Sequence, residues 1–236
     1  ISGAVSPAQV LTAIKSFKNG SSGGLDGLRP QHIKDLISGP LPMEELIGSL
    51  TKFTNLVLSG TCPPAVSRFF FGGRLVALSK KDGGIRPIAI GNFWRRLASK
   101  CALALVLDTA KSRFYPIQLG VGVKGEAEAA VHAVRKLISN LPNQWGLLKI
   151  DFRNAFNTLR RDSLLEAVKL HCPAIYNYCH AAYGSVSSLG YHTWLVESSE
   201  GVQQGDPLGP FLFALALHPL LEKSTSTFIC GYLDDI

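Results

Sequence analysis

The sequence predicts an α+β fold, in which helices and strands follow one another without the regular strand–helix–strand repeat of a parallel sheet. Three observations lead to this prediction. Helical periodicity dominates the N-terminal quarter of the chain and returns between short β-compatible runs. Two of those runs are apolar and end in aspartate, one at Asp151 and one at Asp234. The chain has 236 residues, 46% of them hydrophobic, which is enough for one large domain or two subdomains with a buried core.

Three helices are expected at the N-terminus. The pair Ser6-Pro7 provides a cap and a first helical residue, and so starts the first helix. Pro30 opens the second helix, and Pro42 precedes the third, which ends before Gly60. The third helix is expected to turn one face inward, made of Met43, Leu46, Ile47, Leu50, Phe53 and Val57.

A β-hairpin is expected next, with strands Arg74–Ser79 and Ile85–Ile90 joined by the turn Lys81–Gly84. Residues 93–114 and 125–140 contain no internal proline or glycine, which favours two long helices. The other expected elements are a strand from Trp145 to Asp151, helices at 162–170 and 173–183, a strand around 191–196, a helix after Pro207 and a strand at 228–233.

The charge balance indicates a polyanionic partner. The formal net charge is +7 and the pI is about 9.2, and lysine or arginine placed on phosphates releases condensed counterions. The longest apolar stretches, 101–107 and 211–217, are far shorter than the ~20 residues needed to cross a bilayer. We therefore expect nucleic acid as the partner and no membrane segment.

The cysteines indicate an intracellular compartment, either cytoplasm or nucleus. Their number, five, is odd and they form no C-x-x-C pair, which argues for reduced thiols. His171-Cys172 and Cys179-His180 form a symmetrical set, but their spacing is not a standard zinc spacing and Pro173 interrupts the segment. Ordinary helix residues are the favoured interpretation of this set.

The aspartates that end the apolar runs suggest a metal site. Asp234 and Asp235 stand side by side, and such a pair repels itself unless a cation lies nearby. If the two runs form neighbouring strands, Asp151 meets Asp234. Carboxylates at adjacent strand ends can hold two Mg²⁺ ions, or Mn²⁺, about 3.5–4 Å apart, an arrangement that supports in-line phosphoryl transfer.

At these residues the chain resembles reverse transcriptases. Tyr232–Asp235 matches their YxDD motif, Asp151–Phe156 is similar to their first carboxylate motif, and Gln204–Pro207 resembles the glycine-containing motif between the two. Leu78–Ile88 is similar to the fingers hairpin of enzymes from non-long-terminal-repeat retrotransposons and group II introns, and Gly24–Gly27 resembles their N-terminal extension. All occur in the order typical of the family.

The resemblance implies a right-hand polymerase with fingers and palm, the palm being a ferredoxin-like sheet backed by helices. It divides the chain into an N-terminal helical extension (1–60), fingers (61–140) and an incomplete palm (141–236), with fingers and palm interleaved. The chain begins without methionine and ends one residue after the aspartate pair, so we expect a fragment that lacks its thumb, is inactive in isolation and belongs to a polyprotein with other domains.

The resemblance also implies roles for the aspartates and for the residues around the triphosphate. Asp151 and Asp234 are expected to bind the metals, with Asp235 in a supporting catalytic role. Triphosphate contacts are expected from the backbone of the first carboxylate motif and from the fingers hairpin, namely from Phe152, Asn154, Ala155, Lys80 and Arg86.

Other residues concern the sugar and the template. The ring of Phe156 would collide with a ribose 2′-hydroxyl, whereas Gln204 and Gly205 are expected on the templating side. Asp206 departs from the serine of many relatives, and its effect stays open. Gln118–Gly120 resembles a template-contacting segment. Phe93–Arg96 suits either base stacking or a helix start with a buried aromatic pair.

The function predicted by the resemblance is RNA-directed DNA synthesis, a nucleotidyl transfer of deoxynucleoside triphosphates onto a DNA primer along an RNA template. Two alternatives stay open. One is an RNA-directed RNA polymerase, which Phe156 argues against. The other is an inactive or domesticated remnant that only binds nucleic acid, which the intact aspartates and the pair Gln204-Gly205 argue against.

Overall fold

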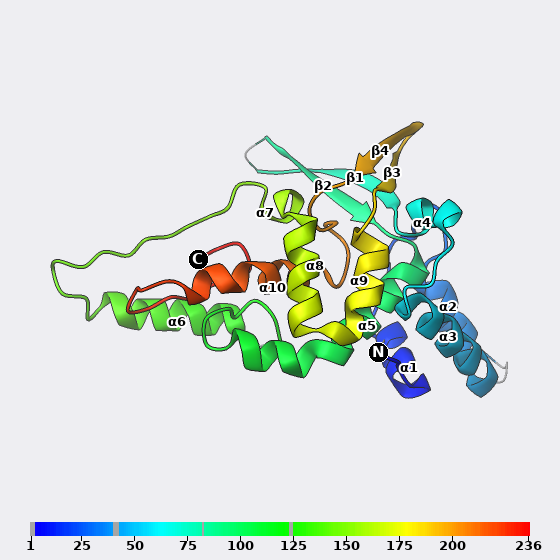
Figure 1. The fold of residues 1–236 in the computed structure, drawn as a ribbon, viewed down its shortest axis with the longest axis horizontal. Coiled ribbons are helices and arrows are strands. Elements are labelled where there is room, and N and C mark those ends of the chain that lie inside the picture. The colour runs from blue at the N-terminus through cyan, green and yellow to red at the C-terminus, as the bar shows by residue number, and fades with distance from the viewer. Residues whose placement is uncertain (1–2, 40–42, 82, 123–124) are drawn as a thin grey trace.

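The computed structural model of the protein describes residues 3–39, 43–81, 83–122 and 125–236. A four-stranded sheet lies along one side of a central group of helices, and the N-terminal helices gather at one end of the molecule (Figure 1). A long helix and an extended segment project from the opposite end. This mixture of a sheet and irregularly ordered helices agrees with the predicted α+β class.

The N-terminal helices are α1 (Pro7–Lys15), α2 (Pro30–Ser38) and α3 (Met43–Leu58). A capping box starts α1, because Gln9 N–H donates to Ser6 Oγ at 3.3 Å and Ser6 N–H donates to Gln9 Oε1 at 2.8 Å. All three helices were predicted from sequence. The prediction of the inward face of α3 was partly wrong, since Met43 and Phe53 are exposed. The ring of Phe53 lies edge-on to that of Trp94, with centroids 4.9 Å apart.

The sheet joins two hairpins. β1 (Gly73–Ser79) and β2 (Ile85–Ile90) form the first, and β3 (Ser187–Tyr191) and β4 (Trp194–Ser198) form the second. The strand order is β2-β1-β3-β4, and β1 runs parallel to β3 with Gly73 opposite Leu189. The predicted first hairpin is confirmed in its strands, whereas the turn residue Asp82 lies outside the described residues.

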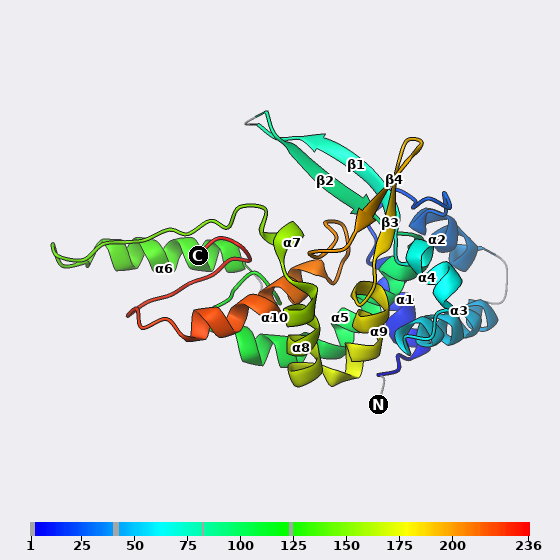
Figure 2. The same ribbon diagram turned by 45° about the horizontal axis from the view of Figure 1, so that its top comes forward.

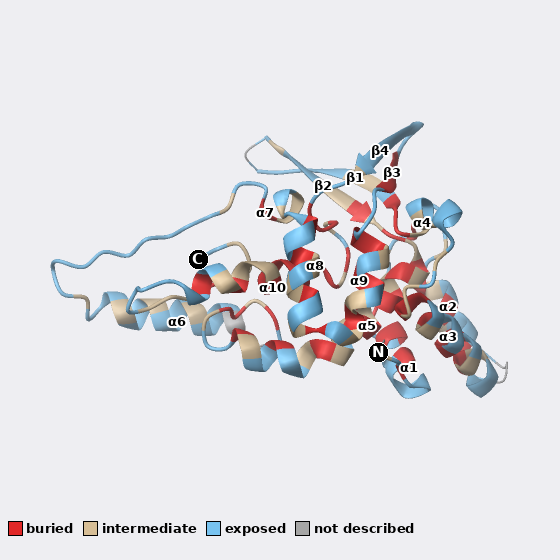
Figure 3. Cartoon of the chain, viewed as in Figure 1, coloured by how far each residue is buried: buried red, intermediate tan, exposed pale blue. Residues whose placement is uncertain are grey.

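The core lies around the helix α5 (Phe93–Phe114), which packs against α1, α3, α10 (Gly209–Glu222) and the 3-10 turn Pro173–Ile175 (Figure 3). α8 (Arg161–His171) packs against α10 and against α9 (Tyr176–Tyr183), whose Tyr178 hydrogen-bonds to α5. Asn92 caps α5 by accepting a hydrogen bond from Arg95 N–H at 2.8 Å. α10 is apolar on nearly every side, as expected for a helix buried in a core. The predicted helices of this region are confirmed.

The two strands predicted to carry the aspartates are not formed. Residues 145–150 are exposed, and the antiparallel contact at the end of this run is limited to the backbone bonds between Ile150 and Ile236 and the isolated bridge between Asp151 and Asp235. Residues 228–233 also form no strand, although Gly231 makes a parallel bridge to Gln118. The local sequence favoured strands in both runs. A strand also needs a partner along its length, and these runs meet a partner only at their ends.

Three further elements differ from the prediction. The strand expected at 191–196 is two strands with a turn between them, where His192 has a φ of 51°. α4 (Pro64–Phe70) and the four-residue α7 (Ala155–Thr158) were not predicted. Both are short, and α4 contains no buried residue, so neither shows the apolar periodicity that reveals longer helices.

The projecting end is formed by α6 (Glu126–Ile138) and the segment that returns from it along residues 139–150 (Figure 2). Apolar side chains in this part are exposed, namely Val131, Ile138, Trp145, Leu147, Leu148 and Ile150. Among the described residues, no helix is both long and apolar enough to cross a bilayer.

A pair of leucines in α8 tests the position of the core. Leu164 is 0% exposed and Leu170 is 75% exposed. We expect Leu164→Ala to lower the free energy of unfolding by about 2–5 kcal/mol, because it leaves a cavity. Leu170→Ala makes the same chemical change in the same helix and should stay within about 0.5 kcal/mol of the unmodified protein. Urea titration followed by circular dichroism measures both values, and equal losses would contradict the packing of α8.

Candidate active site

Asp151 meets the C-terminal turn through a backbone contact. Ile150 N–H donates to Ile236 O at 2.7 Å, and Ile236 N–H donates to Ile150 O at 2.9 Å. Asp151 and Asp235 form the next pair of this antiparallel contact, the one without hydrogen bonds between its members. The Cα atoms of such a pair lie about 4.5 Å apart, and their side chains project from the same face. Two carboxylates from distant parts of the sequence therefore become neighbours.

Asp234 lies within the tight turn that precedes this contact. Tyr232 N–H donates to Asp235 O at 2.7 Å, Asp235 N–H donates to Tyr232 O at 3.2 Å, and Leu233 adopts a left-handed φ of 59°. The backbone partner of Asp151 is thus Asp235, and half-buried Asp234 stands one residue before it. The assignment of Asp151 and Asp234 as the two metal ligands stays a prediction.

Gln118 holds this turn in place. Its Oε1 accepts hydrogen bonds from Leu233 N–H at 2.8 Å and from Gly120 N–H at 3.0 Å, and its Nε2 donates to Leu233 O at 3.1 Å. The side chain is fully buried. Backbone bonds from Leu119 N–H to Gly231 O, 2.8 Å, and from Gly231 N–H to Ile117 O, 2.7 Å, fix the same place. In this structure Gln118 therefore supports the aspartate turn, a role that the sequence did not suggest.

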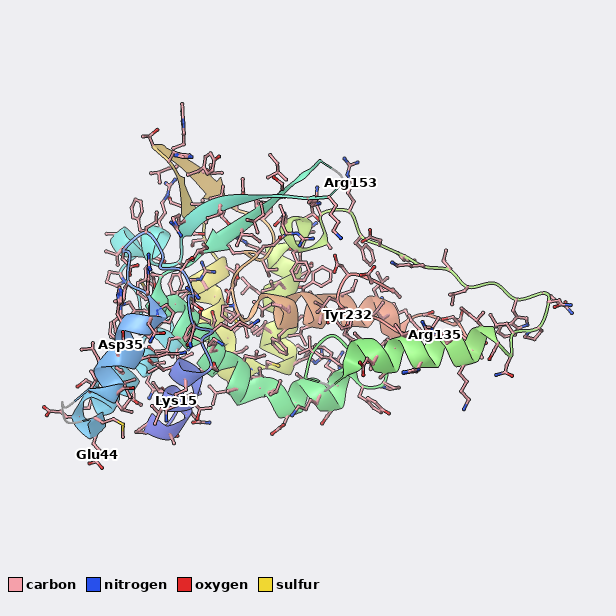
Figure 4. All side chains as sticks on the ribbon, turned by 180° about the vertical axis from the view of Figure 1, so that it is seen from behind. Lys15, Asp35, Glu44, Arg135, Arg153 and Tyr232 are labelled. Atoms are coloured by element: carbon pink, nitrogen blue, oxygen red, sulfur yellow. The ribbon has the colours of Figure 1, made fainter. Side chains whose placement is uncertain are left out.

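Gly120 allows this close approach. A Cβ at Gly120 would lie 2.9 Å from Leu233 N and 2.8 Å from Leu233 Cγ, so a larger residue would displace the turn. Figure 4 shows Tyr232 beside α10, whereas Arg153 lies on the loop that leads into α7. The site is thus formed where the loop after α5, the segment before α7 and the C-terminal turn come together.

The side chains at the site have the negative charge and the oxygen atoms that a divalent cation requires. Asp235 Oδ1 lies 3.1 Å from Lys149 Nζ, and because both side chains are largely exposed this pair contributes at most about 1 kcal/mol. Carboxylate oxygens are the ligands that Mg²⁺ takes in proteins, and Asp151, Asp234 and Asp235 supply them. In the described part of the chain, these groups are not gathered into a cluster of three or more metal-binding side chains.

The residues that follow Asp151 lead into α7. Asn154 adopts a left-handed φ of 54°, and the helix begins at the buried Ala155. Half-buried Phe152 and Phe156 both pack against the core. The ring of Phe156 stacks on the ring of Phe213 from α10, with centroids 4.6 Å apart and planes 23° apart. The orientation of Phe156 is therefore set by the core.

Gln204 and Gly205 lie between α7 and β2. Ala89 N–H, on β2, donates to Gln204 O at 2.7 Å, and Gln204 Nε2 donates to Asn157 Oδ1 at 3.4 Å. Gly205 has a φ of 121°, and a Cβ there would lie 2.4 Å from Ala89 O. Only glycine tolerates both conditions. The structure thus brings Gln204 and Gly205 together with α7, which carries Phe156.

Lys80 and Arg86 lie on the β1–β2 hairpin, where both are exposed. Arg86 is opposite Leu78, and Lys80 N–H donates to Gly84 O at 2.8 Å. Within the described residues, no hydrogen bond or ion pair joins Lys80 or Arg86 to the three aspartates. The hairpin and the aspartates are therefore separate parts of the candidate site in this structure.

The segment Phe93–Arg96 starts helix α5, with Phe93 buried and Trp94 half-buried, and its role in base stacking stays a prediction. Phe93 and Trp94 lie edge to face at 5.1 Å, and Arg95 is buried and paired with Asp206. Sequence reasoning missed Arg95 and its second partner, Gln203. The sequence did contain an indication that Arg95 is buried, because Arg95 shares one helix face with Ala98 and Ala102, which are both buried.

The His171/Cys172/Cys179/His180 set contains two buried thiols. Burial raises the pKa of Cys172, and it raises the pKa of Cys179 well above its ordinary value. Both thiols are therefore protonated at neutral pH in this structure, as is usual for cysteines buried among apolar side chains.

Comparisons with known proteins agree with the motifs. The profile of the family "Reverse transcriptase (RNA-dependent DNA polymerase)" matches residues 78–236. The retrotransposable element SLACS 132 kDa protein of Trypanosoma brucei gambiense is 31% identical over 95% of the chain, which covers 19% of that protein. The Pol polyprotein from the type-1 retrotransposable element R2 of Nasonia vitripennis is 25% identical over 77% of the chain and 18% of its own length.

A third relative is the Pol polyprotein from the type-2 retrotransposable element R2DM of Drosophila melanogaster, which is 26% identical over 87% of the chain and 20% of its own length. The chain therefore spans about a fifth of the length of these relatives.

The support that Gln118 gives to the aspartate turn can be tested directly. Gln118→Leu keeps the size of the side chain but leaves Leu233 N–H and C=O without their partner, so we expect a loss of about 1–3 kcal/mol in the free energy of unfolding. Amide exchange at Leu233 should also accelerate.

The matched control is Gln144→Leu, the same change at an exposed position. It should alter neither quantity. Unchanged exchange at Leu233 in Gln118→Leu would show that the turn is held without this side chain.

Proposed function

Because the chain belongs to the reverse transcriptase (RNA-dependent DNA polymerase) family, and to its non-long-terminal-repeat retrotransposon type, we propose that it carries the nucleotidyl-transfer site of an RNA-directed DNA polymerase. The reaction would add deoxynucleoside triphosphates to the 3′-hydroxyl of a DNA primer along an RNA template. The observation that carries this proposal is the contact between Asp151 and the Asp234–Asp235 turn.

The aspartates would hold the metal ions. Asp151 and Asp234 are the proposed ligands, and Asp235, on the same face as Asp151, would add to the negative potential at the site. When bound, Mg²⁺ would neutralise the charge that develops on the attacking and leaving oxygens. The contribution of the chain itself is to keep these carboxylates together, through the Ile150–Ile236 backbone bonds and through Gln118.

The triphosphate would be bound from two sides. Backbone amides from Phe152 through Asn154 to Ala155 would contact it from the segment that follows Asp151. Lys80 and Arg86 would contact it from the hairpin, Arg86 by a bidentate bond and Lys80 as a point charge.

The sugar and the templating base would be selected nearby. Phe156, held by Phe213, would exclude a 2′-hydroxyl, and Gln204 with Gly205 would form the adjacent wall on the templating side. This arrangement would favour deoxynucleotides over ribonucleotides.

The division into an N-terminal extension (1–60), fingers (61–140) and palm (141–236) is part of the proposal. β1 and β2 would belong to the fingers, and β3, β4 and the contact of Asp151 with the C-terminal turn to the palm, so that the two parts interleave in one sheet. The net charge of +7 suits RNA template and DNA primer as partners. The relatives named as Pol polyproteins are longer, so we further propose that other domains act with this one.

Replacing the aspartates tests the proposed chemistry. In the complete natural polypeptide that contains this chain, Asp151→Asn and Asp234→Asn should each reduce nucleotide incorporation by several orders of magnitude, because the metals lose a charged ligand. Affinity for the primer–template should change little. Primer extension on an RNA template and a binding titration measure the two quantities.

Asp108→Asn is the matched control, because Asp108 is fully exposed on α5. It should extend primers like the unmodified enzyme. Near-normal extension by either Asp151→Asn or Asp234→Asn would contradict the assignment of the metal ligands. An unmodified polypeptide that binds primer–template without any extension would favour the alternative of a remnant that only binds nucleic acid.

Phe156 tests the choice of sugar. Phe156→Val should raise ribonucleotide incorporation strongly relative to deoxynucleotide incorporation, with a modest loss of DNA synthesis, because the shorter side chain opens space without altering the aspartates. Paired extension assays with the two nucleotide types measure this ratio. Phe69→Val makes the same change on the exposed surface of α4 and should leave the ratio unchanged. An unmodified enzyme that already accepts both nucleotides equally would favour the RNA polymerase alternative.

A further inference from the structure

A fully buried ion pair connects α5 to the loop before α10. Arg95 Nη2 lies 3.2 Å from Asp206 Oδ2, and each side chain is 1% exposed. Neither of these residues belongs to the proposed catalytic set. A buried charge that loses its partner is strongly destabilising, so the fold depends on both members being present.

The guanidinium of Arg95 also binds on the other side of the Gln204-Gly205 pair. Arg95 Nη1 donates to Gln203 Oε1 and to the backbone oxygen of Phe71. Asp206 follows Gly205 directly, and Gln203 precedes Gln204 directly. A single arginine side chain therefore fixes both ends of the short Gln204-Gly205 segment.

The partners of this ion pair are themselves fixed. Tyr183 donates its hydroxyl hydrogen to Asp206 Oδ2 at 2.6 Å, and Leu208 N–H donates to Asp206 Oδ1 at 2.9 Å. Gln203 Nε2 donates to Phe71 O at 3.1 Å and to Ser187 Oγ at 2.9 Å. The network thus connects the loop to α9, to β3 and to the end of α4. Its hydrogen bonds satisfy both oxygens of Asp206.

A second arginine holds the start of the same loop. Arg161 donates to the backbone oxygens of Gly201 at 3.0 Å and Ser198 at 2.8 Å. The ring of Tyr183 lies between the two arginines, 5.4 Å from the guanidinium carbon of Arg95 and 5.3 Å from that of Arg161. Cation–π attraction to this ring contributes to holding both guanidinium groups in place.

The protonation states agree with this geometry. Burial disfavours the charged form of Arg95, whereas the neighbouring Asp206 carboxylate favours it, and the pKa of Arg95 is raised above its ordinary value. Burial raises the pKa of Tyr183 well above its ordinary value, which keeps its hydroxyl as a hydrogen-bond donor to Asp206.

The segment held in this way lies against β2 and α7. Gln204 O accepts the hydrogen bond of Ala89 N–H, 2.7 Å, and Val202 N–H donates to Phe156 O at 2.8 Å. A shift of the loop would therefore move Gln204 and Gly205 relative to Phe156. A serine at position 206 would carry no charge and could not compensate the buried Arg95, which explains why an aspartate is needed here.

We propose that Arg95 and Asp206 are positioning residues of the nucleotide site, which hold Gln204 and Gly205 against β2 beside Phe156. This inference rests on the proposed function, because it assigns the held segment to the pocket that binds the incoming nucleotide. Arg95 and Asp206 are buried away from the substrate and act through Gln204 and Gly205. Their loss should therefore weaken nucleotide binding more than it slows the chemical step.

Three variants of the complete polypeptide test three contributions separately: the charge of Asp206, the simultaneous binding of Gln203 and Asp206 by Arg95, and the hydrogen bond from Tyr183 to Asp206. Asp206→Asn removes the charge of the carboxylate. Arg95→Lys keeps the charge but cannot bind Gln203 and Asp206 together, because an ammonium lacks the planar fork of arginine. Tyr183→Phe removes one hydrogen bond to Asp206 and keeps the ring, so it provides a folded variant if the other two unfold.

Two readouts report the position of the segment. Hydrogen–deuterium exchange at Ala89 reports its bond to Gln204, and we expect it to accelerate at least tenfold in Asp206→Asn and Arg95→Lys and less in Tyr183→Phe. The KM for the deoxynucleotide in primer extension should rise about tenfold in the first two variants, with a smaller fall in kcat.

Ile14→Ala is the control for general loss of stability, because Ile14 is fully buried in α1 and belongs to a different part of the core. It should lower the melting temperature without changing KM or selectively accelerating exchange at Ala89. If the variants behave like Ile14→Ala in either readout, the inference is overturned. An unmodified polypeptide without polymerase activity would instead overturn the proposed function, so the two failures are distinguishable.

Discussion

The neutralisation of the buried charge of Arg95 by Asp206 is the interaction on which the arrangement of this molecule depends. α5 brings a guanidinium into the core, where water cannot stabilise it. The loop before α10 must therefore bring a carboxylate to it. Once that pair forms, the loop also lies against β2 and α7, and Phe156 stacks on Phe213 of α10. The position of the proposed nucleotide pocket thus follows from electrostatics in the core.

A second polar contact has the same role for the aspartates. Gln118 is buried and satisfies both backbone groups of Leu233, which would otherwise lack partners inside the turn. This contact places the C-terminal turn against the loop after α5. The Ile150–Ile236 bonds then bring Asp151 to Asp235. α5 therefore connects both halves of the site, because Arg95 lies near its start and Gln118 follows its end.

The exposed parts of the site are those for which the proposed function requires a ligand. Lys80 and Arg86 are exposed on the hairpin, and Asp151 and Asp235 are exposed at the backbone contact. The buried network around Arg95 and Tyr183 is in contrast fully hydrogen-bonded at its carboxylate. A rigid interior with exposed charged groups at its edge suits a site that binds a large polyanion and a nucleotide.

The sequence by itself determined the longer helices, the β1–β2 hairpin and the family. Helices and tight hairpins depend on hydrogen bonds and caps between near neighbours, as at Ser6 and Asn92, and the order of the motifs is read directly from the chain. Only the tertiary structure decided that residues 145–150 and 228–233 do not pair as strands, that Asp151 faces Asp235, and that Arg95 binds Asp206. Each of these contacts depends on partners far away in the sequence. The local preference of a segment for helix or strand carries no information about which distant segment it will contact.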